Sequence, residues 1–299
     1  MYRKDGDAMS KYSPKIDLVF RKLFGSEENT DILLSLINGV IDCDPPLTDL
    51  TIKNPYSLAT YVGDKTSILD IKAVDAQGDW YDIEIQIGEH GYYGKRALYY
   101  LSKMYVDQLV KGKGYDTLHK TIGIHLIDFD YFQDERYRRH FVFKDMETHE
   151  FVEHLSYQQL YFIELSKFRK DWHEVSTLLE RWIAFLNKAT EWDKDSVPVF
   201  VHSDDTMMKA FAKLERLSFN RREREIYEAE LKARLDDIEE LRTAKEKGRE
   251  EGREEGREEE REGIAHNLLR EGLPLEMIAK VTGFTVEEIK RLMDKFDPH

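Results

Sequence analysis

The chain has 299 residues, of which 41% are hydrophobic, 12% are aromatic and 35% are charged, and its formal net charge is −14. This apolar content is enough for a folded core and excludes a disordered protein. The negative charge argues against a protein that coats nucleic acid nonspecifically, but it permits a local basic groove around an acidic, metal-loaded site. With Cys43 as the single cysteine, an intrachain disulfide and a cysteine metal cluster are excluded.

The N-terminal residues and the apolar runs predict the location of the protein. The first segment, "MYRKDGDAMSKYSPKID", lacks the apolar stretch of a secretion signal. No apolar run approaches the length that is needed to span a bilayer. We therefore expect a soluble, cytoplasmic protein that has no membrane partner.

The first helices are predicted within residues 13–41. Apolar residues recur there at helical spacing, and the pattern is interrupted at Gly25 and Ser26. Two helices are therefore expected, with Asn29 or Thr30 as the cap of the second one.

From residue 50 onward the apolar pattern alternates between a period of two and a helical period. A Gly-Asp turn and the sequence "AQGD" separate the first strands, and Gly112 or Gly114 ends the helix that follows them. The pattern predicts strands over 50–56, 67–75 and 80–87, a helix over 92–112, and strands over 121–129, 139–146 and 160–168.

Helices are expected from about Trp172 to the end of the chain. Residues 205–262 indicate one or two long helices, within which "KGREEGREEGREEERE" repeats every four residues. Two interpretations of this repeat stay open: a solvated linker, or a glycine stripe that lets another helix approach closely. The last segment, "GIAHNLLREGLPLEMIAKVTGFTVEEIKRLMDKF", predicts three short helices in a helix-turn-helix-like unit, with Thr285 as the cap of the third.

Acidic residues stand in two of the predicted strands. By alternation Asp70 shares a strand face with Lys72, and Glu84 shares one with Asp82 and Gln86. In a simple hairpin, the carboxylates of Asp70 and Glu84 lie at similar heights on adjacent strands. A hard divalent cation between them would relieve their repulsion and could activate water for phosphodiester hydrolysis. The alternative is a solvated polar sheet face without chemistry.

Several segments together resemble the PD-(D/E)xK nuclease superfamily, and more narrowly the Rpn family of recombination-promoting nucleases, which are also described as transposases. They are "KIDLVFRKLFG", "LDIKAVD", "YDIEIQ", "RALYYLSKMYVDQLVKGKGY", "FIELSKF" and the charged glycine-tetrad tail. The resemblance spans most of the chain and implies an α/β fold with a restriction-endonuclease-like αβββαβ core and a helical C-terminal extension.

The resemblance also implies site residues. Asp70 and Glu84 match the acidic pair that ligates Mg²⁺, for which Mn²⁺ can substitute. Gln86 stands where most of the superfamily has the catalytic lysine; glutamine can position water but carries no charge. Lys72 could return an ammonium group to the site, or it is an ordinary exposed strand lysine. Asp17 could complete the metal shell, or it is an acidic residue favoured by the helix dipole.

The helix over 92–112 is expected to cross the site. Arg96 and Lys103 lie two turns apart on roughly one face and could hold DNA phosphates. The three histidines at 119, 125 and 140 have no evident partners in the sequence.

These expectations divide the chain into a nuclease-like core (10–168), a helical region (169–240), a charged glycine-tetrad helix or linker (241–263) and a small helix-turn-helix-like unit (264–299). The expected function is that of a Mg²⁺-dependent DNA endonuclease in recombination or transposition-like processes, with DNA as partner. The alternative is a catalytically weak or inactive nuclease fold that binds DNA or acts as a scaffold. In either case we expect a homo-oligomer, and the C-terminal region is expected to provide the self-association. The terminal unit could bind DNA or protein, and Glu287 and Glu288 at the start of its third helix favour a protein contact because they would repel phosphates.

Overall fold

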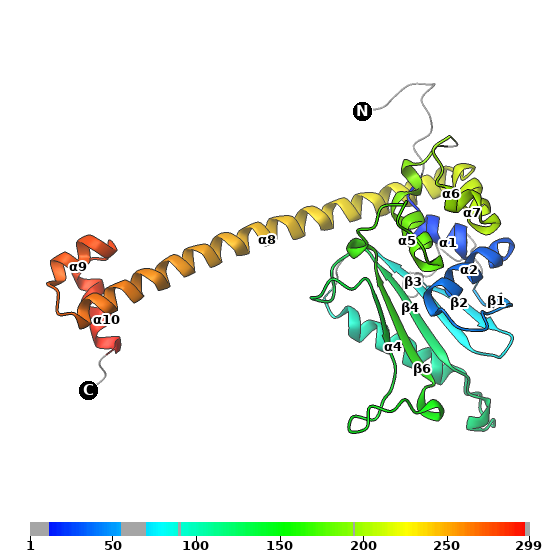
Figure 1. The fold of residues 1–299 in the computed structure, drawn as a ribbon, viewed down its shortest axis with the longest axis horizontal. Helices are drawn as coiled ribbons and strands as arrows, with labels where there is room; N and C mark the ends of the chain where they lie inside the picture. Colours follow the sequence, from blue (N-terminus) through cyan, green and yellow to red (C-terminus); the bar gives the residue numbers. More distant parts are fainter. Residues whose placement is uncertain (1–11, 55–69, 89–90, 194, 297–299) are drawn as a thin grey trace. The chain divides into compact units, whose positions relative to one another are not determined.

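The computed structural model describes residues 12–54, 70–88, 91–193 and 195–296. The chain divides into two compact units, Met1–Arg234 and Leu235–His299. The first unit contains a six-stranded sheet with its helices, and the second is helical (Figure 1). This confirms the predicted mixed α/β class with a helical C-terminal region. Among the described helices, none combines the length and the apolar character that crossing a membrane requires.

The sheet has the strand order β1-β2-β3-β4-β6-β5. Strands β1 to β3 are antiparallel, β3, β4 and β6 are parallel, and β5 pairs antiparallel with β6 at the edge. The predicted strands are confirmed, but each is shorter than predicted, and β5 and β6 begin one and two residues earlier than expected. The predicted residues 55–56 and 67–69 lie outside the described part. The bounds are β1 (Leu50–Ile52), β2 (Asp70–Asp75), β3 (Trp80–Gln86), β4 (Thr121–Ile127), β5 (Arg138–Phe141) and β6 (Gln158–Glu164).

Helices cover both faces of the sheet (Figure 1). On one face α1, α2, α5 and α7 share a large apolar core with the strands, and on the other α4 packs through a smaller cluster that contains Tyr93, Leu101 and Phe162. The bounds are α1 (Asp17–Phe24), α2 (Thr30–Ile41), α4 (Tyr93–Asp107), α5 (Leu178–Lys188), α6 (Val199–His202), α7 (Asp205–Glu215), α8 (Arg221–Arg270), α9 (Leu275–Thr282) and α10 (Val286–Phe296).

The predicted break between the first two helices is present, but its chemistry differs from the expectation. Asn29 precedes α2, yet its side chain makes no cap hydrogen bond to that helix. Its amide nitrogen instead donates to the carbonyl oxygens of Leu23, at 2.8 Å, and Lys22, at 3.3 Å. Asn29 therefore satisfies the last turn of α1, where carbonyl groups lack helical partners.

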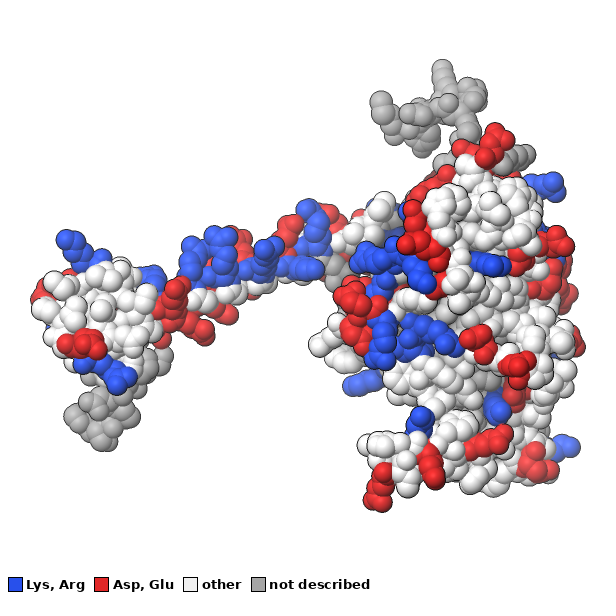
Figure 2. Space-filling model, viewed as in Figure 1, with Lys and Arg blue, Asp and Glu red and all other residues white. Residues whose placement is uncertain are grey.

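The predicted helical segment 205–262 consists of two helices, α7 and the long helix α8. Helix α8 has 50 residues and runs through Gly248, Gly252 and Gly256 without interruption. Among the described residues, none would lie within 4 Å of a Cβ atom built at these three glycines. Charged side chains of both signs follow the helix (Figure 2). Within one chain, this exposure agrees with the solvated-linker interpretation.

The C-terminal helices form the predicted helix-turn-helix-like unit. The end of α8 packs with α9 and α10 around Ala265, Ile278 and Ile289. Thr285 caps α10 as expected: its hydroxyl accepts from the Glu288 amide at 3.2 Å, while the Glu288 carboxylate accepts from the Thr285 amide at 2.7 Å. This reciprocal pair is a capping box.

The first turn of α4 is held by a residue outside that helix. Its N-cap, Tyr92, has a left-handed φ of 72° and provides no side-chain cap. The Tyr131 hydroxyl accepts a hydrogen bond from the Gly94 amide at 3.1 Å instead. A Cβ atom at Gly94 would lie 2.5 Å from that hydroxyl oxygen and 3.6 Å from the next ring carbon. The hydroxyl therefore requires glycine at position 94.

Tyr131 is in turn fixed by a buried carboxylate at the end of β6. Oε1 of Glu164 accepts hydrogen bonds from the amides of Tyr131, at 2.8 Å, and Phe132, at 3.1 Å. Lys167 Nζ lies 2.7 Å from the same oxygen. Glu164 is fully buried, so this ion pair supplies the countercharge that burial demands. The "FIELSK" segment thereby sets the position of α4.

We expect Gly94→Ala to destabilise the first unit by about 1–3 kcal/mol, because the new methyl group collides with the Tyr131 hydroxyl. Tyr131→Phe alone should cost about 1 kcal/mol through the lost hydrogen bond. The double variant should be more stable than Gly94→Ala alone, because removal of the hydroxyl leaves an ordinary contact. Denaturant midpoints and amide exchange at position 94 measure these effects.

Gly91→Ala is the matched control, since among the described residues none lies within 4 Å of a Cβ atom at Gly91. Strictly additive effects of the two substitutions at 94 and 131 would show that the hydroxyl does not hold α4.

Candidate active site beneath helix α4

A row of polar side chains lies on the α4 face of β3. Asp82, Glu84 and Gln86 are only 5%, 4% and 9% exposed. The alternating residues Ile83 and Ile85 point into the core on the opposite face, which confirms the predicted assignment of faces. The alternative of a solvated polar face is wrong for these residues, because at most 9% of each is exposed.

Strand register places Glu84 at the centre of this row. Its Cα partner on β2 is Asp70, as expected from the hairpin, and its partner on β4 is His125. Lys72 of β2 stands opposite Asp82 instead, one position along the same face. The backbone thus brings Asp70 and Glu84 to directly paired positions on adjacent strands.

Arg96 of α4 reaches the polar row from above. Its Nη2 atom lies 2.6 Å from Oε1 of Glu84 and 2.7 Å from Oε1 of Gln86. The Gln86 amide nitrogen donates to the Gly88 carbonyl at 3.2 Å, and this fixes the orientation of the amide. Arg96 also lies over the Tyr93 ring, and 30% of its side chain remains exposed. Arg96 therefore binds the polar row while part of its side chain remains in contact with solvent.

His125 completes the row and was not identified from the sequence. Its Nδ1 atom lies 3.3 Å from Oε2 of Glu84 and 3.0 Å from the Tyr93 hydroxyl. The ring is 2% exposed and stacks on Phe162. The expectation that His125 has no partner is wrong, because the partners come from β3 and α4. The one available signal was a polar residue inside the apolar run "TIGIHLI".

Gly123 makes room for this histidine. It lies two residues before His125 on the same face of β4, and a Cβ atom there would be 3.2 Å from Nε2 of His125 and 2.8 Å from the Leu160 side chain. A larger residue would displace the ring that contacts Glu84.

Two other predicted site residues, Lys103 and Asp17, lie on α4 and α1. Lys103 is exposed on α4 and pairs with Asp107 at 3.2 Å. Asp17 begins α1, on the side of the helices that pack against the opposite face. Among the described side chains, no group of three or more His, Cys, Asp or Glu residues is arranged for a metal. The described contacts bring together Glu84, Gln86 and Arg96.

Two acidic residues, Asp75 and Asp79, lie at the turn between β2 and β3. Oδ1 of Asp75 accepts from the amides of Gln77 and Asp79, both at 2.9 Å, and Oδ2 accepts from the Tyr81 hydroxyl at 2.8 Å. Burial raises the pKa of Asp79, and the hydrogen bond from the Lys120 amide opposes this rise. Burial also raises the pKa of Tyr81. These contacts fix the hairpin register that pairs Asp70 with Glu84.

A basic cluster adjoins the end of β3. The Asp128 amide donates to the Gln86 carbonyl at 2.9 Å. Its carboxylate binds Lys15 at 2.7 Å and Arg234 at 3.0 Å. Residues far apart in the sequence therefore bring two cations to the strand edge beside the polar row.

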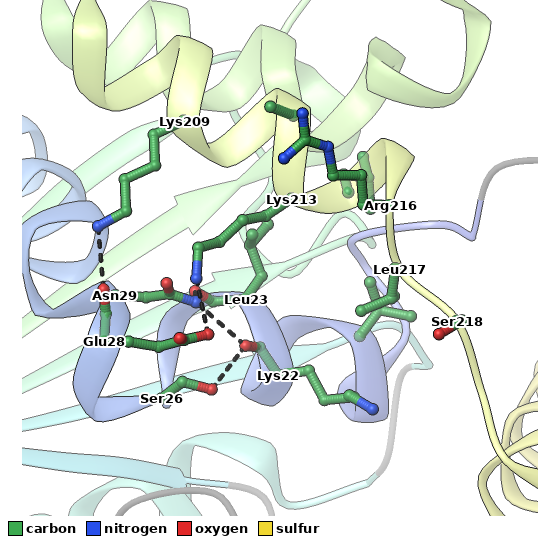
Figure 3. Close-up of a pocket in the computed structure, with 13 residues that line it drawn as sticks. Lys22, Leu23, Ser26, Glu28, Asn29, Lys209, Lys213, Arg216, Leu217 and Ser218 are labelled. Carbon is green, nitrogen blue, oxygen red and sulfur yellow. Dashed lines mark hydrogen bonds and ion pairs between the residues drawn. The ribbon is translucent and has the colours of Figure 1, made fainter.

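A hollow between α1 and α7 is a separate feature (Figure 3). It is lined by Lys22, Lys209 and Lys213 together with apolar residues. Lys213 binds Glu28 at 2.6 Å, Lys22 binds Glu223 at 2.6 Å, and Lys209 donates to the Glu28 carbonyl at 2.9 Å. Each of these three lysines therefore binds an oxygen of another helical segment, and the hollow is part of the packing between those segments.

Comparisons with known proteins agree with this architecture. The model of the PD-(D/E)XK nuclease family transposase matches residues 14–244. The model of the Rpn/YhgA-like nuclease family C-terminal HTH domain matches residues 258–294. Searches of curated proteins and of solved structures gave no match to the chain. The paired strands, the crossing helix and the two matches lead to one conclusion: the chain belongs to the PD-(D/E)XK nuclease family of transposases and carries the C-terminal HTH domain of Rpn/YhgA-like nucleases.

Proposed function

We propose that the protein is a Mg²⁺-dependent DNA endonuclease that acts in recombination or transposition-like strand exchange. The observation that carries this proposal is the direct pairing of Asp70 with Glu84 on adjacent strands, beside the buried side chains of Asp82 and Gln86. The family match supports phosphodiester hydrolysis as the reaction class.

The donor set of the polar row fits a hard divalent cation. Glu84 offers a carboxylate that is 4% exposed and lies beside the amide oxygen of Gln86. Carboxylate and amide oxygens are the ligands that Mg²⁺ prefers. Asp70 and Glu84 would hold the ion, whereas Asp17 begins a helix that packs against the opposite face of the sheet and is left out of the proposed ligands. When bound, the ion would lower the pKa of water and polarise a phosphoryl oxygen.

Arg96 would supply the positive charge that the superfamily places on its lysine. Position 86 holds an uncharged glutamine, but a guanidinium nitrogen lies 2.7 Å from its side-chain oxygen. Positive groups that face a transferring phosphoryl group stabilise its developing charge. Gln86 would then position Arg96 as well as water, since both ends of its amide are engaged. In this assignment Lys72 is an ordinary strand lysine.

DNA is the proposed partner of both units. The basic cluster of Lys15 and Arg234 lies on the unit that carries the acidic pair. The HTH match supports DNA binding by the second unit. Helix α10 begins with Glu287 and Glu288, and the Glu288 carboxylate is occupied by its cap. DNA phosphates that approach the N-terminal end of α10 would therefore be repelled by the carboxylate of Glu287.

Asp70→Asn and Glu84→Gln should each reduce divalent-dependent nicking of supercoiled plasmid by at least about 10²-fold, because each removes a metal-binding charge. Circular dichroism should report an unchanged fold. Glu191→Gln, at an exposed position in the same unit, is the matched control and should retain full activity.

Retention of nicking by either acidic-pair variant would remove these residues from the site. A wild-type protein that binds DNA without cleaving it in Mg²⁺ or Mn²⁺ would instead support the inactive scaffold.

Arg96→Ala should lower nicking by about 10²–10³-fold, the usual effect of removing one transition-state contact. Adding Gln86→Lys to that variant should restore much of the activity, since the ammonium then takes the place of the guanidinium. Single-turnover nicking rates measure both effects.

Gln86→Met in the same Arg96→Ala background is the uncharged control. Equal rates for the two double variants would show that charge at this place does not contribute to cleavage.

A further inference from the structure

The face of α4 that is directed away from the sheet carries an exposed apolar stripe. Leu98, Tyr99 and Val106 are 56%, 62% and 66% exposed. They lie at helical spacing with Lys95 and Ser102, whereas Ala97 and Leu101 face the sheet. A surface helix normally has one apolar face and one polar face. Helix α4 is apolar on both, so its outer face is suited to a second contact.

The connection between β5 and β6 extends this apolar surface. We call residues 142–157 the β5–β6 arm. Its large apolar side chains Phe143, Met146 and Leu155 are all more than half exposed. A hollow of about 420 Å³ joins the arm to the C-terminal end of α4, with Tyr105 and Leu155 among its lining residues. The arm and α4 therefore form one continuous surface.

The charges around this surface are divided between its two parts. Apart from Arg96, residues 92–116 contain four lysines and two aspartates. The arm contains four carboxylates, at Asp145, Glu147, Glu150 and Glu153, and one lysine. Lys103, Lys111 and Lys113 lie toward the C-terminal end of α4, beside the arm, so that end of the surface carries four lysines and six carboxylates and is net negative. Lys95 lies at the other end of the surface. A surface with opposite signs at its two ends is complementary to a copy of itself that is turned by a twofold rotation.

We propose that this surface is the contact between two copies of the chain, with the two α4 helices packed antiparallel about Ser102. Residues equally far from the centre then meet, so Leu98 of one copy packs on Val106 of the partner. The arm adjoins the C-terminal end of its own α4, and the antiparallel arrangement brings it to the N-terminal half of the partner's helix. The arm carboxylates there face the partner's Lys95.

This contact is independent of the nuclease chemistry and of the C-terminal helices. Arg96 and Tyr93 point from α4 toward Glu84 and His125, whereas the proposed contact uses the opposite side of the helix. Pairing would therefore hold α4 from its outer side without using the residues that contact Glu84 and His125.

The first experiment measures the mass of the full-length protein by light scattering. Leu98→Glu with Val106→Glu should halve the mass per particle, because the contact would place carboxylates against each other. Val199→Glu is the matched control: Val199 is 73% exposed on α6, in the helical layer on the opposite face of the sheet. Circular dichroism verifies that both variants fold.

The same comparison separates this contact from any association through the tail, because a tail contact would survive the substitutions on α4. An unchanged mass for the α4 variant, or a wild type that is monomeric at every concentration, overturns the proposal.

The second experiment tests the antiparallel register with a disulfide. In a Cys43→Ala background, Ser102→Cys should form a disulfide-linked dimer in air, since only residues near the twofold axis approach their own copies closely enough. Val199→Cys is the control and should stay unlinked. Equal linking of the two variants overturns the register.

A charge exchange tests the arm. Lys95→Glu should weaken the dimer, and addition of Glu147→Lys and Glu150→Lys should restore it. Failure of the arm substitutions to restore the dimer would overturn the contact between the arm and the partner's α4. Recovery of a different protein in place of the second copy would also overturn the proposal.

Discussion

The ion pair between Glu84 and Arg96 is the interaction on which the site depends. A carboxylate that is 4% exposed cannot remain charged inside a protein unless a cation or several donors compensate it. Here the compensation comes from a helix that is not part of the hairpin, at 2.6 Å. The polar row and α4 therefore depend on each other. Strand β3 supplies the negative charge of Glu84, and α4 supplies the Arg96 guanidinium that balances it.

The position of α4 depends on a second buried charge. Glu164 receives two backbone amides and Lys167, and it thereby fixes Tyr131, whose hydroxyl accepts from the Gly94 amide of α4. Two parallel strands thus contribute to one site in different ways. Strand β3 carries the polar side chains, and the end of β6 sets the helix that reaches them. This explains how the "FIELSK" segment can matter to the site although it supplies no residue of the acidic row.

Much of the fold followed from local patterns. Alternation along residues 80–87 separated Ile83 and Ile85 from Glu84 and Gln86, and the four-residue turn fixed a register that pairs Asp70 with Glu84. Both results are local, because strand geometry and a short turn leave few other arrangements. The cap at Thr285 was predictable for the same reason. The role of Asn29 was not, because its amide group can donate to the carbonyls that end the helix before it or accept from the N–H groups that begin the helix after it.

The sequence by itself determined the α/β class, the paired acidic strands and the helical C-terminal region, since each rests on spacing between near neighbours. Only the tertiary structure decided the partners of those acidic residues. Arg96 and His125 meet Glu84, and Tyr93 meets His125, because β4 lies parallel to β3 and α4 packs on this face of the sheet. A parallel pairing brings together residues about forty positions apart, and no local periodicity encodes that register. The burial of the polar row was undecided for the same reason, because a strand pattern cannot reveal what packs on its second face.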